Sequence, residues 1–513
     1  MKKAVFFLGI SAGSAFSVLN WEFSIPNPVG PPYQELPKLP YESHPNSHFI
    51  SKIPKKIGII GGGLAGLVTA KILKTQGYEI EILEKQSTPG GVWSENYDEA
   101  GLQFAFRSYY LPDDPIKNAP MLPKLDYLQH WINEDIIKKF NLLPLLHCDA
   151  NVTSIRQNED ESWQVNLSDG KSINYDFLVL CAGLYNLPNI PKIKGEESFK
   201  GKIIHSSKFI NAKKLCEGKN VVVIGGLRSA YDISNIAAKN GGKVINIQRR
   251  VHWTKPYGKK FFGINIEKLL FTRFGQLFLM PVDDGFWLYN YCKPLVNWFY
   301  KQVEKKFKED LPEFLHPDLS YASSRSVDIN IRDEEIIKKY ISGEIKHVKG
   351  TVNEITPDGV IVGDNHYKAD LIVYATGFQF STFGIEQEED GTWMYRHTII
   401  PGKKNLAVIG MFRNVGACLG FSIQACWLAE VLRGKVALPG NEEMKNDIAK
   451  RKKIVRKFIR PCNNLNTVAG GIFSYDPFMR DMGLQIRRQK TLFKHYFGFL
   501  DVADYKAVIT HRV

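Results

Sequence analysis

Three glycines with the spacing G-x-G-x-x-G occupy positions 61, 63 and 66 of the chain. In dinucleotide-binding proteins the first such glycine makes a tight turn, the second lets a pyrophosphate lie against backbone N–H groups, and the third lets helix and strand pack closely. Glu84 follows near the offset of roughly 20 residues at which an acid accepts hydrogen bonds from ribose hydroxyls. An acid repels a 2′-phosphate, so the pattern predicts FAD or NAD here. The expected ligands are Gly61, Gly63, Leu64, Ala65, Gly66 and Glu84.

A second turn of the same kind begins at Gly225, although Leu227 takes the place of its second glycine. Arg249 and Arg250 stand at the end of the following strand, where the first unit has its acid. A guanidinium there suits a 2′-phosphate, because it forms bidentate, charge-assisted hydrogen bonds. The pattern therefore predicts NADPH, and the alternative that both arginines are merely exposed stays open. The expected ligands are Gly225, Arg228, Ser229, Arg249 and Arg250.

Small-residue turns follow two apolar runs, Phe177–Cys181 and Leu371–Tyr374. Such a turn at the end of a strand lets the backbone approach a cofactor closely. A further glycine-rich loop follows Glu84, in the place where two-dinucleotide flavoproteins pass a loop beside the flavin. The cofactor-binding residues expected in these turns are Gly91, Val92, Trp93, Thr376 and Gly377.

Both glycine turns need a strand before them and a helix after them, and the residue pattern supplies these elements within about 30 residues each. Two such βαβ units predict an α/β fold with two Rossmann-like dinucleotide-binding domains, in which an inserted NADP domain interrupts the FAD domain. The first unit is expected to contain strand Lys56–Ile60, helix Leu67–Thr75 and strand Glu79–Leu83, and the second strand Asn220–Ile224, helix Tyr231–Lys239 and strand Lys243–Ile247.

The order of these patterns predicts a division of the chain into segments. They are a signal or anchor segment at 1–23, a proline-rich linker at 24–54, an FAD domain at 55–210 and 345–440, an NADP domain at 211–344 and a C-terminal extension at 441–513. Lys2 and Lys3 precede an uncharged apolar stretch, which indicates endomembrane, secretory or organellar targeting; otherwise the expected compartment is cytoplasmic. A chain beginning near Ser51 is expected to keep FAD and activity.

Composition narrows the class of protein. Of the 513 residues, 44% are hydrophobic, which is typical of a globular protein with large cores. The net charge of +14 accompanies no recognisable nucleic-acid module, so no nucleic-acid partner is expected. Seven cysteines without a C-x-x-C disfavour a disulfide framework or a zinc knuckle, and no metal is expected. The aromatic segment Lys268–Phe307 is expected to be helical core, with peripheral membrane contact as the alternative.

The segment before the second turn carries a more specific pattern. Phe199, Gly201, His205 and Phe209 reproduce F-x-G-x3-H-x3-[F/Y], the fingerprint of flavin-containing monooxygenases. The chain also resembles this family, part of the class B flavoprotein monooxygenases, in further segments between residues 55 and 440. These segments are Gly90–Trp93, Ala375–Phe378, Asn405–Gly410 and Gln424-Ala425.

The resemblance implies that NADPH reduces FAD, that the reduced flavin captures O₂ as a C4a-hydroperoxide, and that a soft nitrogen or sulfur nucleophile of a small molecule takes one oxygen atom. It implies a cofactor-binding role for Gln424 and a role for His205 in coupling the two domains. This chemistry needs no side-chain nucleophile, because the cofactor carries the difficult step. No convincing Ser/His/Asp or Cys/His arrangement occurs in the sequence.

Some residues depart from the family pattern. Leu227 replaces a glycine, and Ala182 stands where threonine is common before Gly183. No asparagine lies between Gly101 and Pro112, so Gln103 is nominated as the polar catalytic residue near the flavin. The alternatives left open are Baeyer–Villiger oxygenation, which the phenylalanine at the end of the fingerprint disfavours, oxidative decarboxylation, and a degenerate FAD- and NADP-binding protein without turnover.

Overall fold

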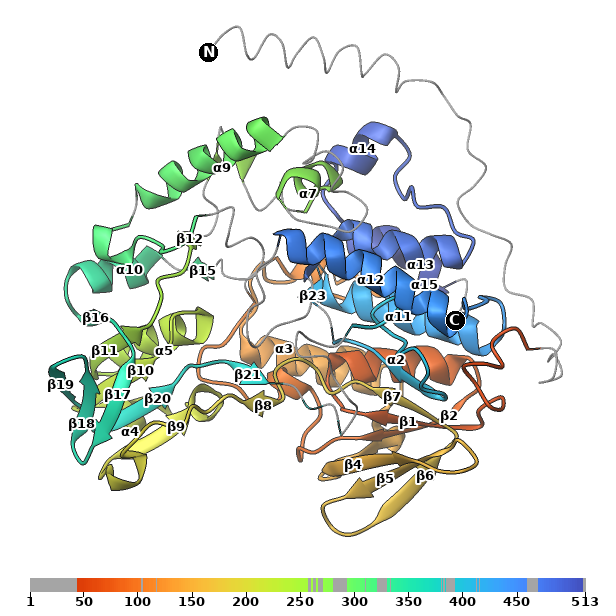
Figure 1. Cartoon of the computed structure of the whole chain (residues 1–513), viewed down its shortest axis with the longest axis horizontal. Helices are drawn as coiled ribbons and strands as arrows, with labels where there is room; N and C mark the ends of the chain where they lie inside the picture. The colour runs from red at the N-terminus through yellow and green to blue at the C-terminus, as the bar shows by residue number, and fades with distance from the viewer. Residues whose placement is uncertain are drawn as a thin grey trace, which may run out of the picture.

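Two five-stranded parallel sheets organise the protein, and each has helices on one face and a three-stranded antiparallel sheet on the other (Figure 1). This arrangement confirms the predicted α/β fold with two Rossmann-like units. The computed structural model describes residues 44–510 except positions 103–104, 117, 257–259, 262–263, 266–270, 280–292, 310, 321–329, 333, 380, 382, 384–392, 412, 415 and 459–468.

The first sheet has the strand order β22-β7-β1-β2-β3. Side chains alternate between its faces because the period of a strand is two residues. Ile57 and Ile59 pack among the helices, whereas Ile60 packs against the antiparallel sheet β4-β5-β6. The bounds are β1 Lys56–Ile60, β2 Glu79–Leu83, β3 Leu146–His147, β4 Val152–Gln157, β5 Trp163–Leu167, β6 Ser172–Tyr175, β7 Phe177–Leu180 and β22 Leu406–Val408, with helices α2 Leu64–Thr75, α3 Leu125–Trp131 and α11 Ala417–Leu432 and the π-helix η4 Ile132–Lys138.

The second sheet has the order β16-β11-β10-β20-β9 and repeats this design. Val221 and Val223 pack with α5, whereas Val222 packs with the antiparallel sheet β17-β18-β19. The bounds are β9 Lys202–His205, β10 Asn220–Ile224, β11 Lys243–Gln248, β16 Ile345–Lys349, β17 Val352–Thr356, β18 Gly359–Val362, β19 Asn365–Lys368 and β20 Leu371–Tyr374, with helices α4 Ala212–Cys216, α5 Arg228–Lys239 and α10 Glu334–Ile341.

The predicted boundaries of the NADP domain are wrong at both ends. β9 precedes residue 211, and β16 and β20 follow residue 344, yet all three strands pair within the second sheet. The β17-β18-β19 sheet packs on the same unit, so residues 345–374 leave the predicted FAD domain. The reason is that the sheet to which a strand belongs depends on its pairing with distant strands, which a local pattern does not reveal.

The chain crosses between the two units on a short antiparallel ribbon. β8 (Leu187–Pro188) leads away from the first sheet, and β21 (Phe378–Gln379) leads back from the second. Phe378 pairs with Pro188 and Gln379 with Leu187, and Figure 1 shows the ribbon between the two sheets. The two crossings therefore meet at one place.

The predicted linker at 24–54 is wrong for its second half. Residues 24–43, and the predicted signal or anchor segment at 1–23, lie outside the described residues. Phe49 and Ile50 are buried in the same core as β1. Asn46 is fully buried; its side-chain N–H groups donate to the carbonyl oxygens of Val431 and Val436 at 2.8 Å each, and its Oδ1 accepts from Leu438 N–H at 2.7 Å. This segment therefore packs against the C-terminal end of α11 and is hydrogen-bonded to it.

The predicted C-terminal extension is also part of the first unit. Tyr475, Phe478 and Val508 are buried in the core that contains β1. Arg273 donates to both carboxylate oxygens of Asp476 at 2.8 and 2.6 Å, with about 5% of each side chain exposed. The bounds here are α12 Asn441–Phe458, β23 Arg413–Asn414, β24 Ala469–Gly470, α13 Asp476–Asp481, α14 Leu492–Phe497 and α15 Lys506–Thr510.

The aromatic segment contains helices α7 and α9, and the buried face of α9 supports the expected helical core. On the opposite face Leu295 and Trp298 are 41% and 52% exposed. Within the described ranges, no helix has the length and apolarity needed to span a bilayer, and no group of acidic, histidine and cysteine residues could hold a metal ion. The bounds are α7 Arg273–Leu279, α9 Lys293–Lys308, β12 Thr254–Pro256, β13 Lys260–Phe261, β14 Ile264–Asn265 and β15 Asn330–Arg332.

Candidate functional site

The first glycine turn joins β1 to α2. Gly61 has a φ of +112°, and a Cβ on it would lie 2.6 Å from the carbonyl oxygen of Cys181. A Cβ on Gly66 would overlap the carbonyl oxygen of Gly61, because helix and strand end approach so closely. The protein's own packing therefore requires both glycines.

Gly63 is a glycine for a different reason. Its backbone is extended, with φ −75° and ψ −179°, which any residue adopts. A Cβ on it would contact only the backbone of Gly91, at 3.5 Å from Cα, which is an ordinary distance. Within the described chain no side chain caps the N-terminus of α2, which begins with Leu64 and Ala65. The turn thus leaves a cradle that a Cβ would fill, beside a helix N-terminus suited to a pyrophosphate.

Glu84 lies directly after β2, beside this cradle. It is 4% exposed, its Oε2 accepts from Gly62 N–H at 2.6 Å, and its Oε1 accepts from Gln86 N–H at 2.9 Å. A carboxylate has about four lone-pair positions, so both oxygens keep the capacity to accept ribose hydroxyls. The residues of the first turn therefore fit an unphosphorylated adenosine ribose and its pyrophosphate.

The segment Gly91–Trp93, here called the GVW loop, lies against the same turn. A Cβ on Gly91 would lie 3.1 Å from Gly63 Cα, so the two backbones nearly touch. Trp93 Nε1–H donates to Tyr109 Oη at 2.9 Å, and the two rings are perpendicular. Val92 is 37% exposed. The structure thus brings the predicted loop to the predicted glycine turn.

Thr376 and Gly377 lie at the crossing between the units, after β20 of the second sheet. Thr376 Oγ1–H donates to the carbonyl oxygen of Asn189 at 2.5 Å. His205 Nδ1 accepts from Ser207 N–H at 3.2 Å, so the ring proton is on Nε2, which donates to the Gly377 carbonyl oxygen at 2.9 Å. Burial lowers the pKa of His205, while its bond to Gly377 opposes this shift. The His205 ring thus hydrogen-bonds the backbone at the crossing between the two units.

Gln424 lies in the fully buried part of α11. Its Nε2 donates to His397 O and to Thr398 Oγ1 at 3.0 Å each, and its Oε1 accepts from Gly410 N–H at 3.3 Å. A Cβ on Gly410 would meet Ala65 Cβ, at the start of α2. The side chain of Gln424 thus hydrogen-bonds the backbone that borders the first turn.

The second turn joins β10 to α5 and has the same local shape. Gly225 has a φ of +149°, and a Cβ on it would overlap the Ala375 carbonyl oxygen. The register shows which residue corresponds to Glu84. Ile60 pairs with Leu83 just before Glu84, and Ile224 pairs with Ile247 just before Gln248. The position of the ribose acid is therefore occupied by a neutral amide, and Arg249 comes one residue later than expected.

Gln248 carries an unpartnered acceptor. Asn246 Nδ2 donates to the carbonyl oxygens of Val223 and Gly225, so its Oδ1 must accept, and it does so from Gln248 Nε2 and from Tyr340 Oη–H. Gln248 Oε1 consequently faces the other way and, although buried, accepts no hydrogen bond from the described part of the chain. An unpaired buried acceptor costs about 1–3 kcal/mol, which a ligand hydroxyl beside Gly226 would recover.

The basic residues of the second turn differ in their surroundings. Arg228 begins α5, and its Nε–H donates to Asp232 Oδ2 at 2.7 Å, while Ser229 follows it on the first turn of the helix. Arg249 and Arg250 are exposed, and neither forms an ion pair with the described part of the chain. The neutral amide and two available guanidinium groups fit a 2′-phosphorylated ribose.

The sequence places Gln248 beside Arg249 at the end of this strand but did not mark it as a ligand, although counting strand residues forward from both glycine turns puts it in the position of Glu84. Gln103, the nominated catalytic residue, lies outside the described residues.

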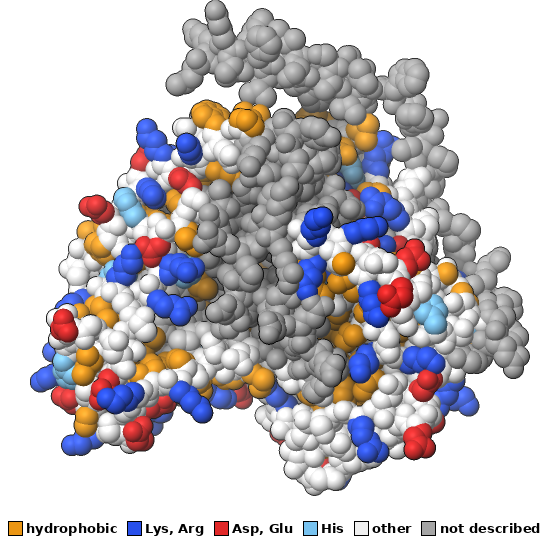
Figure 2. Space-filling view, in the orientation of Figure 1, with side chains coloured by type: hydrophobic (Ala, Val, Ile, Leu, Met, Phe, Trp, Pro, Cys, Tyr) orange, Lys and Arg blue, Asp and Glu red, His pale blue; other side chains and the backbone are white. Residues whose placement is uncertain are grey.

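Acidic and basic side chains are interspersed over the face shown in Figure 2, in agreement with a solvated surface carrying the net charge. In each sheet, the residues that the sequence predicts as cofactor ligands of the glycine turn gather at the end of the sheet where that turn lies.

Comparison with known proteins places this architecture. A model of the flavin-binding monooxygenase-like family matches residues 54–492. The chain is 27% identical over 432 residues to dimethylaniline monooxygenase [N-oxide-forming] 2 of Pan troglodytes, covering 77% of each chain. It is 26% identical over 527 residues to the probable flavin-containing monooxygenase 1 of Arabidopsis thaliana, covering 90% of this chain and 98% of that one.

A solved structure shares the fold over most of its length. S-allyl-L-cysteine S-oxygenase from Allium sativum superposes with a TM-score of 0.55 at 18% identity, over 89% of this chain and 97% of that one. The family match covers both glycine turns, the fingerprint and the crossings. The chain therefore belongs to the flavin-binding monooxygenase-like family, and it is a flavin-dependent oxidoreductase that acts on O₂ and a small-molecule substrate.

Proposed function

We propose that this enzyme holds FAD in its first unit and NADPH in its second, and that it transfers one oxygen atom of O₂ to a soft nitrogen or sulfur nucleophile. The observation that carries the proposal is the contrast between the two turns. Glu84 borders one of them, whereas neutral Gln248 and Arg249, which forms no ion pair with the described residues, border the other. This contrast suits one plain and one phosphorylated adenosine ribose.

In this proposal the first turn binds FAD. Gly61 and Gly66 shape the turn, Gly63 leaves room for the pyrophosphate at the α2 N-terminus, and Glu84 accepts the ribose hydroxyls. The GVW loop lies against the same turn, and Thr376 and Gly377 lie at the crossing between the two units. Bound FAD supplies the reaction with O₂ that no protein side chain provides.

The second turn is proposed to bind NADPH. The pyrophosphate lies at the N-terminus of α5 beside Arg228 and Ser229, and Gln248 Oε1 accepts a ribose hydroxyl. Arg249 binds the 2′-phosphate with Arg250 as a second ligand. His205 is proposed to keep the crossing between the two units in register, and Gln424 to support the backbone beside the first turn.

The nucleophile class rests on relatives of the chain. The name of one relative states N-oxide formation, and that of the structural neighbour states S-oxygenation of a thioether amino acid. Phe209, fully buried at the end of the fingerprint, occupies the position at which tryptophan would favour the Baeyer–Villiger branch. A soft amine or thioether is therefore the proposed substrate class.

The test uses the purified full chain. Bound flavin that NADPH bleaches indicates an enzyme, and a substrate-dependent gain of one oxygen atom, seen by mass analysis, indicates a monooxygenase. Amines and thioethers are expected to be oxygenated in a panel that also holds ketones and 2-oxo acids. Ester formation from ketones would instead indicate Baeyer–Villiger oxygenation, and CO₂ release from the 2-oxo acids would indicate oxidative decarboxylation. Flavin that NADPH does not reduce would indicate a protein without turnover.

Replacement of Arg249 by alanine is expected to weaken NADPH about 10-fold to 150-fold, because a hydrogen bond to a charged group contributes roughly 1.5–3 kcal/mol. NADH lacks the phosphate and should be nearly unaffected. The measurement is kcat/KM for both coenzymes, with exposed Arg156 on β4 changed to alanine as the matched control. An equal fall for the two coenzymes, or no fall for NADPH, would show that Arg249 does not bind the phosphate.

We further propose that the outer face of α9 contacts an anionic membrane surface. Leu295 and Trp298 are exposed there at helical spacing with the exposed Lys301 and Lys305, and apolar side chains gather at this edge of the molecule (Figure 2). Buried aromatic area together with lysine charge is what binds a helix to a membrane surface.

In sedimentation with anionic vesicles, Trp298→Glu is expected to lower the bound fraction of protein several-fold. The substitution replaces the largest apolar side chain of the face with a negative charge, which the anionic lipid repels. Exposed Leu143 in the first unit, changed to glutamate, is the control and should not alter binding. Equal binding of all three proteins would exclude this face.

A further inference from the structure

Residues 94–100, here called the strap, follow the GVW loop directly and link the two units. Both ends of the strap are held by α3 of the first unit. The Ser94 carbonyl oxygen accepts from Gln129 Nε2–H at 3.0 Å, and the Ala100 carbonyl oxygen accepts from Leu125 N–H at 2.9 Å. The strap is thus rigidly connected to the loop that lies against the first glycine turn.

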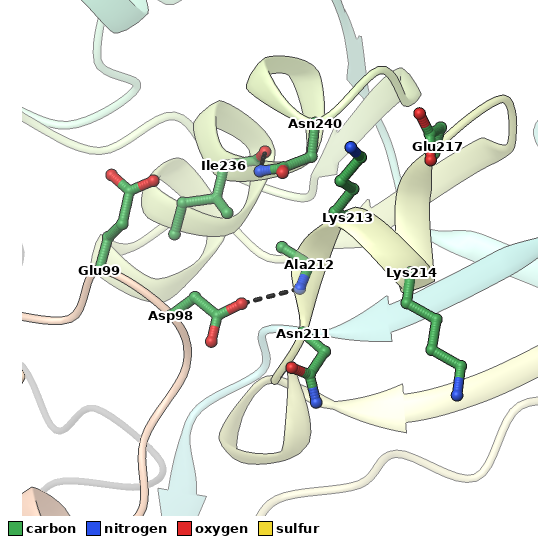
Figure 3. A pocket seen from close by; sticks show the side chains of 9 residues that line it. All are labelled: Asp98, Glu99, Asn211, Ala212, Lys213, Lys214, Glu217, Ile236 and Asn240. Carbon is green, nitrogen blue, oxygen red and sulfur yellow. Dashed lines mark hydrogen bonds between the residues drawn. The ribbon is translucent and has the colours of Figure 1, made fainter.

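The middle of the strap packs into the second unit. Tyr97 and Ala100 are 9% and 2% exposed, and they belong to the core formed around α5. Asp98 Oδ2 accepts from the backbone N–H of Ala212 at 2.7 Å, at the edge of a cavity of about 650 Å³ between the strap and helices α4 and α5 (Figure 3). A first-unit segment therefore contributes buried side chains to the core of the second unit.

Tyr97 reaches one particular group there. Its Oη–H donates to Asp232 Oδ2 at 2.8 Å, and the same oxygen accepts from Arg228 Nε–H at 2.7 Å. Burial, together with the adjacent Asp232 carboxylate, raises the pKa of Tyr97 far above its usual value, so the phenol keeps the proton that it donates. The carboxylate is thus shared between a strap residue and the first residue of α5.

Arg228 stands where the second turn enters its helix. The N-terminus of a helix after a glycine turn attracts phosphate groups, and a guanidinium in this place adds charge-assisted hydrogen bonds. Its Nε–H donates to Asp232, one helical turn further along. Asp232 in turn accepts a hydrogen bond from Tyr97, which packs in the second unit while the two ends of its strap are bonded to α3 of the first unit.

We propose that Tyr97 is a positioning residue for NADPH: through Asp232 it holds Arg228 toward the coenzyme pyrophosphate, and so ties coenzyme binding to the placement of the GVW loop. This inference rests on the proposed function, which puts NADPH at the second turn. Without the Tyr97 hydroxyl the carboxylate rotates more freely, and Arg228 follows it.

The test measures binding of NADP⁺ to the full-length holoprotein by titration calorimetry. Tyr97→Phe is expected to weaken NADP⁺ about 3-fold to 10-fold, the usual effect of one net hydrogen bond. Adenosine 2′-monophosphate, which has no pyrophosphate, should bind Tyr97→Phe as it binds the wild type. Arg228→Ala should weaken NADP⁺ more, and adding Tyr97→Phe to it should cause no further loss.

The matched control is Tyr175→Phe. Tyr175 also donates from a buried hydroxyl to a carboxylate, that of Glu81 at 2.7 Å, but it lies in the first unit away from the second turn. Its loss should leave NADP⁺ affinity unchanged. FAD content and the thermal midpoint of Tyr97→Phe should match those of this control.

Three results would overturn the inference: unchanged NADP⁺ affinity in Tyr97→Phe, an equal loss for both ligands, or effects of Tyr97 and Arg228 that add in the double variant. Failure of the proposed function is distinguishable, because the wild-type holoprotein would then bind no NADP⁺ at all. A wild type that binds NADP⁺ beside an unaltered Tyr97→Phe would reject the positioning role alone.

Discussion

Replacement of Gly63 by valine is expected to give a folded protein that purifies almost without flavin. Alanine at this position is expected to disturb the protein less than valine, because its Cβ would lie at an ordinary contact distance of 3.5 Å from Gly91 Cα. The added side chain fills the cradle at the start of α2, where the proposed pyrophosphate lies against backbone N–H groups. The expected defect is therefore in cofactor binding, with little change in the fold.

Gly66→Ala should behave in the opposite way. Its Cβ would overlap the carbonyl oxygen of Gly61, so β1 and α2 must separate and the whole unit loses stability. The ratio of flavin to protein absorbance and the thermal midpoint of the apoprotein separate the two effects. Gly440→Ala, where a Cβ meets nothing within 4 Å, is the control. Stoichiometric flavin in Gly63→Val would show that the first turn does not hold the pyrophosphate.

Removal of residues 1–50 is expected to unfold or strongly destabilise the first unit relative to a chain from which only residues 1–43 are removed. The chain that begins at Ser51 loses the buried side chains of Phe49 and Ile50, and the burial of each contributes roughly 1.5–3 kcal/mol to the stability of the fold. It also loses Asn46, which leaves the Val436 carbonyl oxygen without its donor at a cost of about 1–3 kcal/mol, whereas the Val431 carbonyl oxygen keeps a bond from Gly434 N–H. The sum approaches the whole stability of a typical domain, about 5–15 kcal/mol.

Thermal denaturation and flavin content of the two truncated proteins, beginning at His44 and at Ser51, provide the measurement. Asn46→Ala in the full chain isolates the contribution of the hydrogen bonds, and His48→Ala is a neighbouring control whose ring contacts only one carbonyl oxygen, that of Pro439. The expectation drawn from sequence, that a chain beginning near Ser51 keeps its flavin, is the outcome that would contradict the packing described here.

The sequence alone predicted both nucleotide units almost to the residue. β1, β2 and β10 have the predicted bounds, β11 extends one residue further, and α2 and α5 begin three residues earlier than predicted. These elements are specified locally, because a β-branched run, a glycine turn and a helical apolar pattern follow one another within one βαβ unit. Family membership followed from the same kind of local information, since the fingerprint around His205 is contiguous.

Tertiary structure alone decided what depends on distant pairing. Nothing within residues 345–374 indicates that β16 and β20 complete the second sheet, because their hydrogen-bond partners are more than 90 residues away. The unpartnered carbonyl of Gln248, the burial of Asn46 and the bond from Tyr97 to Asp232 are likewise products of long-range packing. Motif spacing specifies a turn and its helix, whereas the environment of a side chain is set by whichever remote segments fold against it.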